Sequence, residues 1–364
     1  NFNLSQGDIL NLLYQWYNQS GQTVDFNTFV NFVSNRIDIN GIVNTMRNGQ
    51  FFPGNVIFVS PKGMVVGSSG LLNVGSLSVV TPKKEDFDKF VGQAETYAPI
   101  LAQPGTTEYN QVIDSMGAAN VTINGRVMAR NSVNIDAGDV VIGSEGKILT
   151  GVKSDAAFTP DGSYPIKPDD TGAGETSFGT PYRVINDPGM STAGAYSDAE
   201  VLFNNLVNTS ISNGASIRND NGSVTITAYA PEGGIRTEEG SLVRNYAHGD
   251  IVFSNVGSNG IDLNGNIENY TGTNRIINTG LAGILLAPTG IITGEGRTLL
   301  SNTGSGGIQV EGHVTSKGID VENQNSDVVI GNLDKPEDEN YLYSTGDDVN
   351  ININNGNLYN AGVA

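Results

Sequence analysis

The chain has 364 residues, of which 47 are Gly and none is Cys, and 38% are hydrophobic. Its formal net charge of −19 creates a field that repels phosphate, so nucleic acid and anionic lipid are excluded as expected partners. Without Cys, neither a disulfide scaffold nor a thiolate metal site can form.

The first 50 residues differ from the rest, and we expect them to form an N-terminal cap that leads into a solenoid. Apolar residues at helical spacing follow Asp8, a good N-cap residue, and predict a short amphipathic helix. A second apolar run spans 26–33. Both would cover the open end of a solenoid, which otherwise exposes an unpaired strand edge. The helical pattern comprises Ile9, Leu10, Leu12, Leu13, Trp16 and Tyr17.

Residues 51–153 consist of short β-rich runs broken by Gly or Asn, and they predict the first coils of the solenoid. The strand pattern lapses at 82–118, where we expect an excursion from the main body. Within it, the charged segment 83–91 has a helical pattern. Strands resume at 121, and Gly125 and Gly146 then hold equivalent places about 21 residues apart.

A second excursion is predicted at 154–210, because this segment is polar and rich in Pro, Gly, Asp and Thr. A short helix at 198–207 would close it.

An open repeat of about 23–26 residues occupies 211–364, and we expect it to continue beyond this sequence. Its consensus, N-x-G-x-x-G-I, occurs three times. Gly and Asn most readily adopt φ > 0, so we expect them at the corners between strands. The predicted corner residues are Asn255, Gly257, Gly260, Asn278, Gly280, Gly283, Asn302, Gly304 and Gly307.

This repeat length admits leucine-rich repeats or a parallel β-helix. The L-x-x-L-x-L frame of leucine-rich repeats is missing, and the units have almost no helical segment. β-Sandwiches use short strands, but they would not keep one repeat phase. We therefore predict an all-β, right-handed parallel β-helix of about a dozen coils, with an N-terminal cap and loop or helix excursions.

The segment from Gly54 to Gly67, with its continuation to Leu77, resembles the secretion domain of filamentous haemagglutinin-like exoproteins. That family reads, roughly, G-x-(apolar)4-N-P-N-G-(apolar)2-x-G, followed by N-V-G-G-L. Ser60 and Lys62 replace the two Asn residues of the N-P-N-G element, which leaves open which residues a partner reads. The later coils are similar to those of leukotoxin-like filamentous adhesins. The matching positions are Ser60, Pro61, Lys62, Gly63, Gly67, Asn73, Val74 and Gly75.

The resemblance implies two-partner secretion, in which an outer-membrane β-barrel transporter recognises this region and passes the chain to the cell surface or the medium. It implies a secretion-targeting and folding-nucleating role within a large adhesin, whose full length would engage a host-cell or bacterial surface receptor. A cytolysin or a contact-dependent toxin carrier of the same family remains an alternative. We expect a monomer.

A carbohydrate-active enzyme, a polysaccharide lyase or hydrolase, is the alternative from a different class, because parallel β-helices also serve in that role. Such a site needs acids stacked on successive coils, yet Asp262 aligns with Leu285 and Gln309. The acidic runs at 169–170, 337–339 and 347–348 are expected to be solvated loops. His248 and His313 lack metal-ligand spacing. We therefore predict no catalytic residue, no metal and no cofactor.

Overall fold

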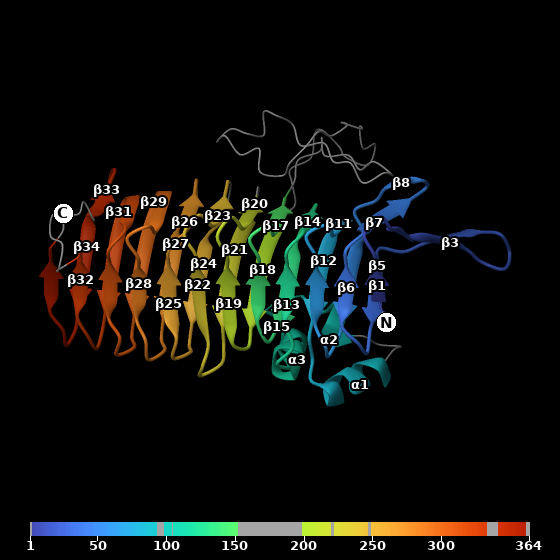
Figure 1. Cartoon of the computed structure of the whole chain (residues 1–364), viewed down its shortest axis with the longest axis horizontal. Helices are drawn as coiled ribbons and strands as arrows, with labels where there is room; N and C mark the ends of the chain where they lie inside the picture. The colour runs from blue at the N-terminus through green and yellow to red at the C-terminus, as the bar shows by residue number, and fades with distance from the viewer. Residues whose placement is uncertain are drawn as a thin grey trace.

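In a computed structural model, the chain forms an all-β, right-handed parallel β-helix (Figure 1). The structure describes residues 2–92, 98–103, 105–151, 199–219, 222–246, 249–332 and 341–361. Each coil contributes one strand to each of three parallel faces, and each strand pairs with its equivalents in the coils before and after it. The predicted fold class is confirmed.

Face 1 is a 12-stranded parallel sheet that begins at the second residue of the chain. Its strands are β1 (Phe2–Leu4), β6 (Ile37–Ile39), β10 (Met64–Val66), β13 (Val121–Ile123), β16 (Val140–Ile142), β19 (Asn208–Ile211), β22 (Gly234–Thr237), β25 (Gly260–Leu263), β28 (Ile284–Leu286), β30 (Ile308–Val310), β32 (Val328–Ile330) and β35 (Leu358–Asn360).

Faces 2 and 3 join through two long strands, β29 (Ile291–Asn302) and β31 (His313–Asn323), each of which runs along both faces. The other strands of face 2 are β2 (Ile9–Leu13), β7 (Ile42–Arg47), β11 (Leu71–Val74), β14 (Arg126–Ala129), β17 (Lys147–Thr150), β20 (Ser216–Asn219), β23 (Leu242–Asn245), β26 (Asn266–Asn269) and β33 (Tyr341–Ser344). Those of face 3 are β5 (Thr28–Phe32), β9 (Asn55–Val59), β12 (Ser76–Val80), β15 (Val133–Ala137), β18 (Ala199–Asn205), β21 (Gly222–Ala228), β24 (Ile251–Asn255), β27 (Asn274–Asn278) and β34 (Val349–Ile353).

A narrow apolar core runs the length of the coils, because inward positions of successive strands stack in register. Burial of each Ile or Val side chain contributes about 1.5–3 kcal/mol. One column on face 1 is almost entirely aliphatic and fully buried. It runs through Ile39, Val66, Ile123, Ile142, Ile211, Thr237, Leu263, Leu286, Val310 and Ile330.

The predicted helix over the first apolar run is wrong, because β2 and β3 (Gln15–Tyr17) lie there instead. β2 pairs in parallel with β7, so these residues already belong to the first coil, and strand pairing overrides the helical spacing. β3 and β4 (Thr23–Asp25) form an antiparallel hairpin that projects beyond the N-terminal end of the stack (Figure 1). β8 (Gln50–Phe51) folds back on β7.

Three helices lie in the predicted excursion at 82–118: α1 (Lys84–Gly92), α2 (Ala98–Leu101) and α3 (Thr107–Ser115). They cover the outer surface of face 3, where Ile57, Val59 and Val80 form a second apolar cluster with Phe87 and Val112. Face 3 is therefore apolar on both sides at this level, which anchors the helices.

The predicted excursion at 154–210 lies mostly outside the described residues. Its closing helix at 198–207 is wrong, since β18 occupies this segment and pairs with β15 and β21. Val201 and Phe203, two positions apart, point into the core. That alternation of inward positions is typical of a strand.

Candidate functional site

The residues that carry the family resemblance begin with a turn that connects β9 on face 3 to β10 on face 1. The Ser60 hydroxyl is buried, donates to the Asn35 carbonyl oxygen at 2.8 Å and accepts from the Lys62 backbone N–H at 3.2 Å. Gly63 has φ +80°, and a Cβ there would lie 2.1 Å from the Asn120 carbonyl oxygen of the next coil. This turn therefore fixes the spacing between two successive coils.

The second part of the motif surrounds β11 on face 2. A Cβ at Gly67 would lie 1.9 Å from the Asn40 Oδ1 atom, and a Cβ at Gly75 would lie 2.1 Å from the Pro53 carbonyl oxygen. Val74 is fully buried in the core, and Asn73 is buried in register with residues of the neighbouring strands. Both glycines are thus required by close contact with an earlier coil.

Only Lys62 of the eight motif residues is exposed, while Pro61 and Gly67 are half-buried. Gly54, at the start of the resembling segment, is packed against the Tyr14 ring, where a Cβ would lie 2.4 Å away. In the folded chain these residues build the turns and packing of the first coils. A partner that meets the folded chain can contact few of their side chains.

The predicted corner asparagines form a buried ladder. The Asn255 Nδ2 atom donates to the Asn278 Oδ1 atom at 2.8 Å, and Asn278 donates in the same way to Asn302 at 2.7 Å. Asn302 donates to Asn323 at 2.7 Å, which extends the ladder beyond the predicted set. Each amide also satisfies a backbone group of its own corner, such as the Gly257 carbonyl oxygen at 2.7 Å.

The expected left-handed conformation at these corners is confirmed only for Gly260 and Gly307, at φ +72° and +78°. The ladder asparagines are strand residues without positive φ, so that interpretation of their role is wrong. Gly257, Gly280 and Gly304 are required instead by close stacking. A Cβ at Gly280 would lie 1.9 Å from the Gly257 carbonyl oxygen, for example.

A buried polar cluster that the sequence did not point to joins α3 to face 3. Asp136 on β15 accepts hydrogen bonds on its Oδ1 atom from the Tyr109 hydroxyl at 2.6 Å and from the Asn204 Nδ2 atom at 2.8 Å. The Asn134 amide donates to the Asp136 Oδ2 atom at 3.4 Å and to the Tyr109 hydroxyl at 3.0 Å. The cluster therefore ties the helical excursion to β15 and β18.

Burial raises the pKa of Asp136 to about 6, against the lowering effect of its three hydrogen-bond donors. Burial, followed by the Asp136 charge, raises the pKa of Tyr109 well above its usual range. Asp136 also lines a cavity of about 380 Å³ between the helices and face 3, with Ser78 and Gln103 on its walls. Asp136 occupies an outward position on β15, where an acidic residue is expected to be exposed. Its burial beneath the helices could therefore not be predicted from the sequence.

Aromatic side chains pack together against the core of the first coils. The Tyr14 ring centroid lies 5.4 Å from that of Phe26, 5.1 Å from Phe29 and 5.3 Å from Phe52. Its hydroxyl donates to the Asn55 carbonyl oxygen at 2.6 Å. Trp16, in contrast, is 57% exposed on the projecting hairpin.

Stacked acids suited to glycosidic chemistry do not gather at the predicted repeat positions. Asp262 lies in register with Arg236 on one side and Leu285 on the other. In the part of the chain that the structure describes, no group of three or more acids and histidines could hold a metal ion. His248 and the acidic runs at 169–170 and 337–339 lie outside that part.

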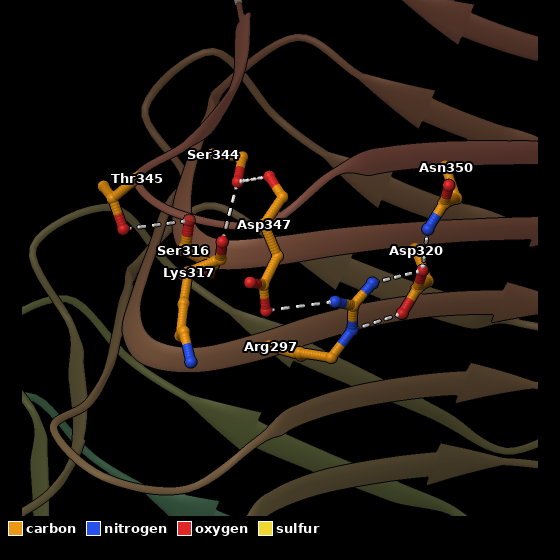
Figure 2. Close-up of polar contacts among 8 residues, drawn as sticks. All are labelled: Arg297, Ser316, Lys317, Asp320, Ser344, Thr345, Asp347 and Asn350. Carbon is orange, nitrogen blue, oxygen red and sulfur yellow. Dashed lines mark hydrogen bonds and ion pairs between the residues drawn. The ribbon is translucent and has the colours of Figure 1, made fainter.

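Charged residues of the last coils pair with one another instead (Figure 2). The Arg297 guanidinium donates to both Asp320 carboxylate oxygens, at 2.6 and 2.8 Å, and lies 3.5 Å from Asp347. Asn350 donates to Asp320 at 2.9 Å. This cluster links three successive coils through charge-assisted hydrogen bonds.

No protein family, no curated protein and no solved structure matches the chain. Among the described residues, no helix has the length and apolar character needed to cross a membrane.

Proposed function

We propose that the chain is the secretion-targeting and folding-nucleating region of a large surface or secreted adhesin, exported through an outer-membrane β-barrel transporter. The observation that supports this proposal most strongly is that the residues of the secretion-domain resemblance build contacts between successive N-terminal coils. Gly63 contacts the following coil, and Gly67 and Gly75 contact the preceding one. Contacts of this kind hold the first coils in register with one another.

The parallel stack gives a physical reason for coupling folding to export. Each new coil pairs its strands with the coil before it and buries two or more aliphatic side chains in the shared core. Because one buried aliphatic side chain is worth about 1.5–3 kcal/mol, each added coil makes backward movement of the chain costly. Coil formation outside the cell would then favour net outward movement.

The N-terminal aromatic cluster supports the same role. Tyr14, Phe26, Phe29 and Phe52 pack together against the core of the first coils, which would shield part of this core without a preceding coil. A stack that is covered at its first coil can begin to form while later residues are still inside the transporter.

The test is secretion of this chain, with a signal peptide, from Gram-negative cells with and without the cognate transporter. The proposal expects accumulation in the medium only when the transporter is present. Release without the transporter, or retention in the periplasm in both strains, would contradict it. Gly21→Ala serves as the matched control for Gly63→Ala. Both glycines have positive φ, but no atom lies near the Cβ position of Gly21.

A further inference from the structure

A hollow in the outer surface arises where the loops between faces 2 and 3 change length from coil to coil. The loop between faces 2 and 3 spans residues 270–273 in one coil. The equivalent loop shortens to 295–297 and then to 317–318 in the next two coils. In the coil after these it lengthens again, to 345–348. The short loops therefore form a floor between two longer loops. The resulting groove has a volume of about 550 Å³, within the range of small-ligand sites.

An aromatic ring stands at one end of this groove. Tyr270 stacks on Tyr246 of the preceding coil, with ring centroids 5.0 Å apart and planes 9° from parallel. The Arg218 guanidinium lies 4.5 Å from the Tyr246 centroid, one coil further back. Tyr246 covers one face of the Tyr270 ring, and the Tyr270 side chain lines the groove. Tyr270 is 38% exposed.

Hydrogen-bonding side chains line the rest of the groove. Thr293 and Thr315 lie in register on adjacent strands of face 2, and both are half-buried. Glu295 and Lys317 are exposed and carry the only charges among the described residues that line the groove. The neighbouring Arg297 is already paired with Asp320 and Asp347, and the Lys317 side chain stands apart from that cluster (Figure 2).

Together, one partly exposed aromatic ring, the hydroxyls of Thr293, Thr315 and Thr345, one donor cation and one acceptor anion match the chemistry of a sugar ring. The C–H face of a pyranose packs on an aromatic ring, while its hydroxyls both donate and accept. The two charges that the described lining residues carry cancel, and the net charge of −19 repels polyanions. We propose that this groove binds a neutral oligosaccharide, independently of the export proposal.

The test is binding of four neutral hexasaccharides to the full chain: cellohexaose, maltohexaose, chitohexaose and mannohexaose. Saturation-transfer NMR detects binding, and calorimetry measures affinity. We expect at least one to bind, and hexagalacturonate not to bind. Tyr270→Ala should weaken binding about tenfold, which is the usual worth of one aromatic contact. Thr315→Val, which preserves shape, should also weaken it.

Two controls separate the groove from the general surface. Tyr359→Ala removes another exposed tyrosine, and Lys62→Ala removes another exposed lysine, both outside the groove. Neither should change affinity, and circular dichroism checks that each variant folds. Absence of binding by all four neutral probes up to about 10 mM would overturn the proposal. So would binding of hexagalacturonate alone, or an affinity unchanged by both Tyr270→Ala and Thr315→Val.

Discussion

Replacement of Asp136 by Asn should change how stability depends on pH. Burial raises the pKa of this carboxyl from 3.8 to about 6 in the folded chain, so the folded state holds the proton more tightly than the unfolded state. The stabilisation from the bound proton is fully present below about pH 3.8 and is lost as pH rises to about 6. This change in pKa corresponds to about 3 kcal/mol in the free energy of unfolding.

The amide oxygen introduced by Asp136→Asn can still accept from Tyr109 and Asn204, because both donate to the same carboxylate oxygen. Urea unfolding at about pH 4 and about pH 7.5 measures the wild type and Asp136→Asn side by side. As the pH rises from about 4 to about 7.5, the free energy of unfolding of the variant should increase by about 2–3 kcal/mol relative to that of the wild type. Comparison with the variant cancels the contributions of the other acids. If the two proteins differ in free energy of unfolding by the same amount at both pH values, the raised pKa of the buried Asp136 carboxyl is refuted.

Three further changes test the contacts between coils. Asn278→Ala should lower the free energy of unfolding by about 3 kcal/mol or more, because it leaves buried groups of the ladder without partners; exposed Asn350→Ala should cost far less in the same urea titration. Gly280→Ala should lower the melting temperature, since its Cβ would lie 1.9 Å from a backbone oxygen. Gly63→Ala should destabilise the chain more than Gly21→Ala, because both have positive φ but only Gly63 faces a close contact. Equal melting temperatures for these last two variants would contradict the role given to the turn.

Much of the coil architecture could be predicted from the sequence because its signals are periodic. The N-x-G-x-x-G-I repeat and the aliphatic runs identified the stacked strands, and Asp262 does align with Leu285 and Gln309. The charged helix expected at 83–91 is present as α1. These features depend on local pattern and on one repeat phase, which a single sequence reveals.

Contacts between distant parts of the chain could not be predicted. Asp136 is buried by Tyr109 on α3, and nothing in the local sequence of either residue indicates the other. The apolar spacing around Leu12 fits a helix and a strand equally well, and pairing with β7 decides between them. Asn beside Gly is typical of a corner between strands, which is why the sequence predicts the ladder asparagines there. Their amides instead donate to one another between coils. The groove beside Tyr270 depends on differences in loop length that emerge only once the register is known.

The N-terminal coils are proposed both to direct export and to start coil formation. The rate at which the chain appears in the medium of cells that carry the transporter tests this proposal. Ile308→Asp places a charge in the core of a late coil and leaves the N-terminal coils intact. We expect transporter-dependent secretion of the wild type, and slower secretion of Ile308→Asp at an equal intracellular level. An unchanged rate for this variant, with its late coils shown to be unfolded, would contradict the coupling of folding to export.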